Sequence, residues 1–455
     1  MAEFLIHSAG LPEWLAWTIT AAVAAVLILN VIAGGALVFI WAERKIAARI
    51  QDRLGPTRTG GRFGWLQSLA DGIKLLAKED LMPEGADGML FRLAPYVSFC
   101  ASFCAFIALP FAFDFVGCRL NVGVFFVVAV LGLEVFGVIL AGYASASKWS
   151  LFGAMREAAQ VVSYEVPLGM CVVVPVMLAG SMDLVTIAEK QAGWLTNWYL
   201  FHDPFTFVIF WVYVTCAVAS VNRAPFDLAE AESELVAGFH TEYSGLRWSY
   251  FFMAEYGSMF LVSAMAAVLF LGGWNGPIPV AKLAGLSAGT GDTAHYLVRL
   301  LGLANLLGKA TLGVLVMMWI RWTLPRLRID QVMTTCLKYC TPIAAAMFAG
   351  ALLWQLALPG GLVPGAGRPA GEIREGWLEG PGGRRAQDAG AAAKGRLAEV
   401  RPTPPSPLPL GEAGRRPGEG AGAAARTSRA LTPTPLPEGE GLATPAAKNV
   451  AKVVP

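Results

Sequence analysis

Eight long apolar segments constrain the fold of this chain more than any other feature. They fall near residues 14–42, 89–112, 121–145, 158–180, 204–221, 248–273, 296–320 and 336–358. A helix needs about 20 apolar residues to cross a bilayer, and several of these segments reach that length. Only 15% of the 455 residues are charged, whereas soluble domains average roughly 25%. The sequence therefore predicts an all-α, polytopic membrane protein with about eight transmembrane helices.

Lysine and arginine are distributed unevenly among the loops. The loops after the first, third, fifth and seventh segments carry, in that order, Arg44, Lys45, Arg49, Arg53, Arg58 and Arg62; Lys148 and Arg156; Arg223 and Arg247; and Arg321, Arg326 and Arg328. The alternate loops carry little more than Arg119, Lys190 and Lys282. Because short basic loops stay in the cytoplasm, we expect both termini to face outward. The N-terminus lacks the basic region of a cleaved signal peptide, so the first span is expected to remain.

The first cytoplasmic loop, residues 43–87, is too long for a simple connector. Apolar side chains recur within it at helical spacing, at Trp65, Leu69, Ile73 and Leu76. Polar side chains occupy the opposite face, at Asp71, Lys74 and Lys78. This amphipathic pattern predicts a short helix along the membrane surface. The alternative is a loop that only rests on the lipid headgroups.

Two carboxylates stand inside apolar segments, Glu134 in the third and Glu165 in the fourth. An anion at the centre of a bilayer costs at least about 2.5 kcal/mol. Each carboxylate is therefore expected to be protonated, to be paired, or to face an internal wet cavity. The alternative to a functional role is a structural pairing with Arg156 or another cation.

An acid-rich stretch, residues 222–255, lies between two apolar segments, and we take it as the functional centre. Its acids are Asp227, Glu230, Glu232, Glu234, Glu242 and Glu255. A helix over 227–237 would place Asp227, Glu230 and Glu234 on one face, with Glu232 pointing elsewhere. Carboxylates this close raise each other's pKa values, as a proton relay requires. The alternative is a solvated acidic face that docks a basic partner.

Other features exclude some functions. The net charge of +2 is too small and too scattered to predict nucleic-acid binding. The seven cysteines occur singly or four residues apart, as in Cys100/Cys104 and Cys336/Cys340. Neither pair has metal-ligand spacing, so we expect packed thiols and no metal site.

The composition changes abruptly after the last apolar segment. Residues 359–455 are rich in Gly, Pro, Ala and Arg and contain a short repeat that starts at Pro407 and again at Pro435. Such a segment buries too little apolar surface to offset its ordering entropy. We therefore predict a membrane domain over 1–358 and a disordered tail over 359–455.

Several long motifs occur in order along the chain. They are ERK at 43–45, LGP at 54–56, QSLADGIKL at 67–75, AGYAS at 141–145, AQVVSYEV at 159–166, the block 222–255, and LPRLRIDQ at 324–331. On these motifs, residues 14–350 resemble the quinone-site membrane subunit of respiratory complex I, known as the H subunit in bacteria and as subunit 1 in mitochondria.

The resemblance implies a non-redox-centre subunit of a proton-translocating NADH:quinone oxidoreductase in the bacterial inner membrane. The outward-facing termini expected from the basic loops would then be periplasmic. Ubiquinone would be the substrate, and NADH, FMN and iron–sulfur clusters would be bound by partner subunits. The implied partners are the peripheral-arm quinone-site and iron–sulfur subunits and the antiporter-like and small membrane-arm subunits.

The resemblance also implies roles for individual residues. The quinone-binding residues would be Arg44, Lys45, Asp71, Glu79 and Arg223. The acidic path that couples quinone reduction to proton movement would contain Glu165, Asp227, Glu230, Glu232 and Glu234.

The sequence departs from the family pattern at one acid. The family usually has a Glu three residues before the Arg of the central loop, where this chain has Ser220. Glu134 and Glu157 stand where uncharged residues are expected, and whether either replaces the missing acid is open. Two other functions also stay open, a stand-alone ion transporter and the anchor subunit of a membrane-bound hydrogenase. The chain shows no internal repeat of the kind common in transporters.

Overall fold

The computed structural model describes residues 12–112, 115–278 and 292–357. Every regular element in these residues is a helix, which confirms the all-α prediction. The predicted disordered tail, residues 359–455, lies outside the described residues. The structure does not describe the side chain of Glu232.

Seven helical runs of the described chain are long and apolar enough to cross a membrane. They are α2 (Glu13–Ile50), α4 (Gly88–Ala108), α5 (Gly123–Ala144), α6 (Lys148–Ala179), α10 (Gly245–Phe270), α12 (Asp292–Thr323), and a last run made of α13 (Ile329–Met333), the π-helical turn η4 (Thr334–Cys340) and α14 (Thr341–Ala357). The remaining expected span is α8 (Pro204–Ser220), whose 17 residues are at the lower end of spanning length. Each of the eight expected segments thus contains a helix.

Two helices continue beyond the apolar segments that predicted them. Helix α2 ends at Ile50 instead of residue 42, and α6 begins at Lys148 instead of residue 158. Both extensions contain buried acids, since Glu43 is 4% exposed and Glu157 is fully buried. Protein contacts replace water around these polar turns, so the helices do not end where the hydropathy falls.

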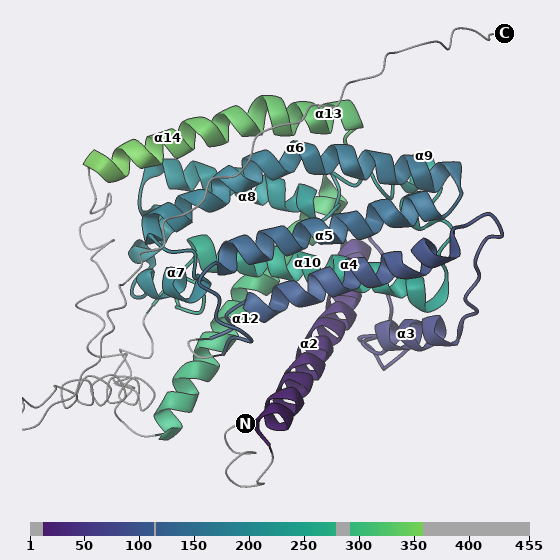
Figure 1. Ribbon diagram of the computed structural model, residues 1–455, viewed down its shortest axis with the longest axis horizontal. Coiled ribbons are helices and arrows are strands. Elements are labelled where there is room, and N and C mark those ends of the chain that lie inside the picture. Colours follow the sequence, from purple (N-terminus) through teal and green to yellow (C-terminus); the bar gives the residue numbers. More distant parts are fainter. Residues whose placement is uncertain (1–11, 113–114, 279–291, 358–455) are drawn as a thin grey trace, which may run out of the picture. The chain divides into compact units, whose positions relative to one another are not determined.

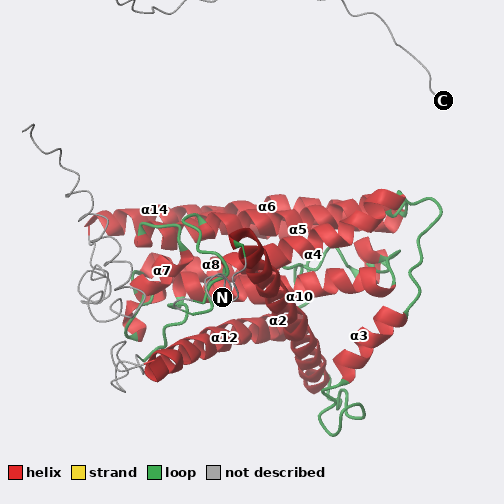
Figure 2. Ribbon diagram, turned by 60° about the horizontal axis from the view of Figure 1, so that its bottom comes forward, coloured by secondary structure: helices red, strands yellow, loops and turns green. Residues whose placement is uncertain are grey.

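Helix α10 lies at the centre of the bundle. It packs against α2, α4, α8 and α12, and 78% of its apolar window is buried, whereas the other spanning helices reach at most 50%. Helices α4, α5, α6 and α14 run alongside one another, and α2 and α12 run obliquely to them (Figures 1 and 2). The outer helices leave apolar side chains exposed, as a surface facing lipid or other subunits requires.

Glycines allow close contact between neighbouring helices. A Cβ added at Gly137 of α5 would lie 2.7 Å from the backbone N of Ser98 in α4. A Cβ added at Gly142 would lie 2.4 Å from the Cβ of Ala154 in α6. Small residues at membrane-helix contacts let backbones approach and pack by dispersion forces. These glycines therefore explain how α4, α5 and α6 fit together.

The predicted amphipathic helix is present as α3 (Gln67–Ala77). It packs against α2 and α10. The side chains of Trp65, Leu69, Ile73 and Leu76 are all exposed. The helix thus presents an apolar surface, as an interfacial helix does.

The central loop between α8 and α10 contains only two short helical turns, α9 (Glu232–Leu235) and η3 (Gly238–His240). Residues 227–237 therefore do not form the single helix that would have placed Asp227, Glu230 and Glu234 on one face. The backbone takes a positive φ at Ala231 and Val236, which interrupts helical geometry. The physical reason is that the acids of this loop contact different partners, which one helical face could not reach.

The fold of the central loop depends on Gly238. Its φ is +60°, and an added Cβ would lie 1.8 Å from the carbonyl O of Ala229. We expect Gly238→Ala to destabilise the protein by about 2 kcal/mol or more, through backbone strain and displacement of the loop. The measurement is the thermal unfolding midpoint in detergent. Gly169→Ala in α6 is the control, because no atom lies within 4 Å of its added Cβ. Equal midpoints for the two variants would contradict this account of the loop.

Candidate functional site

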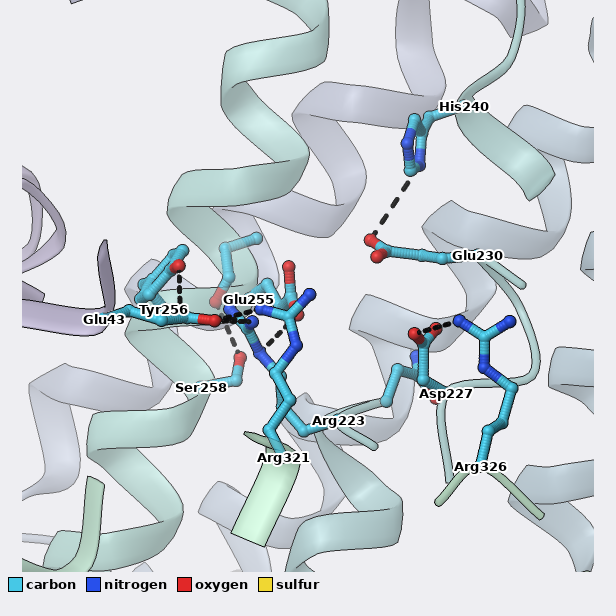
Figure 3. A network of polar contacts seen from close by, with 12 residues as sticks. Glu43, Arg223, Asp227, Glu230, His240, Glu255, Tyr256, Ser258, Arg321 and Arg326 are labelled. Atoms are coloured by element: carbon cyan, nitrogen blue, oxygen red, sulfur yellow. Dashed lines mark hydrogen bonds and ion pairs between the residues drawn. The ribbon is translucent and has the colours of Figure 1, made fainter. Parts of the chain in front are cut away.

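The side chain of Arg223 is the centre of a buried ion cluster where the central loop meets α2 and α10 (Figure 3). Arg223 is 3% exposed. Its Nε lies 2.7 Å from Oε1 of Glu255, and its Nη1 donates to both carboxylate oxygens of Glu43 at 3.3 Å. The guanidinium also lies 4.6 Å from the ring centre of Tyr256. Burial alone would lower the pKa of Arg223, but Glu255 and Glu43 outweigh it and raise that pKa above its ordinary value.

The Glu43 carboxylate joins four parts of the chain. Besides Arg223, it accepts hydrogen bonds from the Tyr256 hydroxyl and the Arg321 guanidinium. These partners come from the central loop, α10 and α12, while Glu43 itself lies in α2. Breaking a buried ion pair costs about 3–5 kcal/mol, because the remaining charge has no partner. The cluster therefore fixes the ends of the helices that surround the loop.

Two further ion pairs hold the acids of the loop. Asp227 Oδ2 accepts from Arg326 Nη2 at 2.8 Å, and Glu234 Oε2 accepts from Arg156 Nη1 at 2.6 Å. Asp227 is buried, whereas the Glu234 side chain is about half exposed. The loop is thus attached both to α6 and to the segment after α12.

Glu230 lies apart from these cations and faces His240 (Figure 3). Its Oε1 is 3.9 Å from His240 Nδ1. Burial, reinforced by the carboxylates of Glu255 and Asp227, raises the pKa of Glu230 well above its ordinary range. Burial lowers the pKa of His240 to about 4. Near neutral pH the contact therefore joins two uncharged groups, and Glu230 has a proton to give when nearby charge changes.

A small pocket lies beside this cluster, with a cavity volume of about 30 Å³. Its polar lining consists of Ser98, Glu134, Glu157, Ser220, Asn222, Glu230 and Glu255. Glu134 accepts a hydrogen bond from the Ser258 hydroxyl, and Glu157 accepts one from Asn222. Both unexpected acids of the spans thus share a pocket with Ser220, although sequence could not place them there.

Glu165 does not join this pocket. Its side chain lies exposed on α6. A Cβ added at Gly132 of α5 would lie 3.6 Å from Oε1 of Glu165. Glu232 begins α9, and its side chain is outside the description. The five acids expected in one path therefore have different surroundings. Asp227 pairs with Arg326, Glu230 lines the pocket and Glu234 pairs with Arg156, while Glu165 lies on the surface of the chain.

Three of the expected quinone-binding residues lie where α2 meets α3. Arg44 forms an ion pair with Asp71, and Lys45 Nζ donates to the carbonyl O of Pro56 at 2.6 Å. Glu79 is exposed beside the start of α10, since its backbone O accepts from Ser244 Oγ at 3.1 Å.

The expected quinone-binding residue Arg223 belongs instead to the buried ion cluster. Because Glu43 and Arg44 are consecutive, the cluster and the α2–α3 junction adjoin at the end of α2.

No group of three or more His, Cys, Asp or Glu side chains in the described part of the chain is arranged to hold a metal ion. All seven cysteines are free thiols, and Cys171, Cys216, Cys336 and Cys340 are buried.

Sequence reasoning missed most of the ion cluster. Glu43 and Arg321 are 278 residues apart, and each looked like an ordinary polar residue at the end of a span. Two features of the sequence could have indicated the cluster. Glu43 and Arg321 have opposite charges at the same predicted membrane face, and Glu255 is an acid inside the sixth span.

A bundle of apolar helices that buries an arginine–carboxylate cluster defines a polytopic membrane protein with ionisable groups enclosed between its helices. The family model described as NADH dehydrogenase matches residues 23–351. The chain therefore belongs to the NADH dehydrogenase family, which confirms the resemblance drawn from its motifs.

Individual relatives agree with the family assignment. The chain is 46% identical over 325 residues to the NADH-quinone oxidoreductase H subunit of Chlorobium luteolum, covering 70% of this chain and 85% of that protein. It is 41% identical over 347 residues to the corresponding protein of Anaeromyxobacter dehalogenans, covering 76% and 84%. It is 44% identical over 333 residues to that of Bacillus mycoides, covering 73% and 93%.

Proposed function

We propose that this chain is the membrane subunit of a bacterial NADH-quinone oxidoreductase that forms much of the quinone site and couples quinone reduction to proton translocation. The observation that carries the proposal is the buried cluster of Arg223, Glu43 and Glu255 beside the pocket with Glu230. Bacterial relatives named as the H subunit of this oxidoreductase support it. No observation favours the hydrogenase anchor or the stand-alone transporter.

The quinone reaches its site through the junction of α2, α3 and α10. Quinones dissolve in the bilayer, so an entrance needs apolar side chains at the membrane surface and polar groups further in. The exposed Trp65, Leu69 and Ile73 supply the first, and the Arg44–Asp71 pair supplies the second. The Arg44 guanidinium suits a quinone oxygen that gains negative charge on reduction.

Quinone reduction consumes two electrons and two protons to form a quinol. Iron–sulfur and flavin groups in peripheral-arm subunits would supply the two electrons. This chain supplies the surroundings in which charge and protons move. Negative charge on the reduced quinone attracts the arginines at the end of α2, and the pairing of Arg223 with Glu255 weakens. This favours proton uptake by Glu255, and the protonated Glu230 in the same pocket is a donor for it.

Proton movement continues into the membrane arm through Glu165. Its exposed position on α6, next to α5, suits transfer to a neighbouring membrane subunit. Antiporter-like and small membrane-arm subunits are the proposed partners on this side, and the peripheral arm is the proposed partner at the central loop. A carboxyl on a lipid-level helix face is expensive unless such a partner covers it.

The quinone site is tested by photolabelling the assembled complex with an azido-quinone. We expect adducts in residues 44–79, because the entrance lies between α2 and α3, and excess unlabelled quinone should abolish them. Arg44→Ala should reduce labelling severalfold. Arg119→Ala is the control, since Arg119 also forms an ion pair, with Asp183, but lies in the loop between α4 and α5. Adducts that excess quinone does not displace would rule out a specific site here.

The coupling role is tested with Glu230→Gln and Glu165→Gln in the complex reconstituted into vesicles. Each variant keeps the size of the side chain but loses its proton, so we expect quinone reduction or proton pumping to fall about tenfold or more while assembly is retained. The exposed Glu84 gives the control variant Glu84→Gln, which should match the parent protein. Full activity and full pumping in both test variants would remove these acids from the mechanism.

The proposed orientation places both ends of the membrane domain in the periplasm. Its support is the gathering of Arg156, Arg223, Arg321 and Arg326 around the central loop, at one end of the bundle. The α4–α5 loop is then periplasmic, and it contains the exposed thiol of Cys118. A membrane-impermeant maleimide should label Cys118 in right-side-out vesicles and not in inverted ones, with Cys118→Ser as the control. Labelling in inverted vesicles only would contradict the proposed orientation.

A further inference from the structure

We infer that Glu157 is a proton-carrying residue of the internal pocket, through which protons pass between the acids of the central loop and Glu134 in the third span. The inference rests on the proposed coupling function and adds to it a residue and a route. Glu157 lies in α6 and is fully buried.

One oxygen of Glu157 is held in place and the other is free. Its Oε1 accepts from Asn222 Nδ2 at 2.9 Å. Its Oε2 is buried and has no hydrogen-bond partner among the described residues. Buried polar atoms are nearly always bonded, and an exception at a polar pocket indicates water or a proton acceptor. The free oxygen therefore marks the side of Glu157 on which a proton or a water binds.

Asn222 is oriented so that it donates to Glu157. Gln160 Nε2 donates to Asn222 Oδ1 at 2.9 Å and to the carbonyl O of Ala219 at 2.8 Å. Because Asn222 Oδ1 faces Gln160, its NH₂ group is the one that faces Glu157. Its φ of +53° is a conformation that Asn tolerates better than most residues. This arrangement links Glu157 of α6 directly to the central loop.

The pocket joins Glu157 to acids on three other elements. Glu230 comes from the central loop, Glu255 from α10 and Glu134 from α5, and all of them line the same space as Glu157. Glu134 is anchored by the Ser258 hydroxyl. A pocket with several polar partners suits buried water, which would connect the carboxyl groups by hydrogen bonds.

The supply of positive charge is too small for all these acids to be ionised. Among the described residues, the arginines of this region pair with Glu43, Glu255, Asp227 and Glu234. No ion pair in this part of the chain reaches Glu134 or Glu157. Neighbouring carboxyl groups without a cation share protons and titrate together. A proton entering from the central loop is thus passed among them, and no bond other than O–H is made or broken.

The test is Glu157→Gln in the complex reconstituted into vesicles. Glutamine keeps the acceptor for Asn222 and the volume, so a purely structural role would survive the change. We expect proton pumping per NADH to fall at least tenfold, while azido-quinone labelling stays within twofold of the parent. Glu84→Gln is again the matched control.

Ser220 provides the rescue, because it lines the same pocket. We expect Ser220→Glu to restore at least half of the parent pumping in the Glu157→Gln background. Ser220→Gln, of the same size but without a titratable proton, should restore none. Rescue by both variants would show that volume is what matters and would overturn the inference.

The remaining outcomes separate this inference from the proposed function. If Glu230→Gln impairs pumping and Glu157→Gln does not, the role of Glu157 is overturned and the proposed function stands. If neither variant has an effect, both fail. If Glu157→Gln does not assemble, Glu157→Asp keeps a titratable group at an altered distance. A proton carrier then shifts the pH profile of pumping, and an unchanged profile overturns the inference.

Discussion

The buried guanidinium of Arg223 is the constraint on which the rest of the structure depends. A charge in so apolar a setting is tolerated only with partners close to it, because its desolvation is expensive. Glu43 and Glu255 supply these partners from two different helices, and Tyr256 covers the face of the guanidinium. The central loop therefore enters the bundle at one place and in one orientation. The paths of α2, α10 and α12 meet there.

The same constraint separates the acids that have a cation partner from those that do not. Arginines neutralise the carboxylates that tie helices together, such as Glu43 and Asp227. The acids left over, Glu230, Glu157 and Glu134, line the pocket instead. Carboxyl groups with and without a cation partner thus lie side by side, and we propose that the acids without a cation exchange protons. A proposed function in proton coupling follows from this division of roles.

Local sequence patterns predicted the elements of the fold well. Segment length and hydropathy located the helices, and the spacing of Leu69, Ile73 and Leu76 located α3, because both signals depend only on neighbours in sequence. The ends of α2 and α6 were misjudged, since their polar turns are buried by contacts that hydropathy does not include. The expected helix over 227–237 failed for a related reason. Asp227 pairs with Arg326, 99 residues further on, and that pairing shapes the loop more than local propensity does.

The candidate site was predicted in composition but not in arrangement. The acids of the loop were identified because charged residues beside apolar segments are expensive to retain. The sequence did not show that Glu165 lies outside the pocket, nor that Glu134 and Glu157 lie within it. Which face of a helix points inward depends on packing, and packing follows from contacts between residues far apart in the chain.

The central position of α10 bears on how the protein is made. This helix is enclosed by its neighbours and also carries Arg247, Glu255 and Ser258, which lipid would not accept unaided. Contacts with α2, α4 and α8, all synthesised earlier, offset the cost of placing these polar groups in the bilayer. We therefore expect these three spans to be in the bilayer before α10 packs between them.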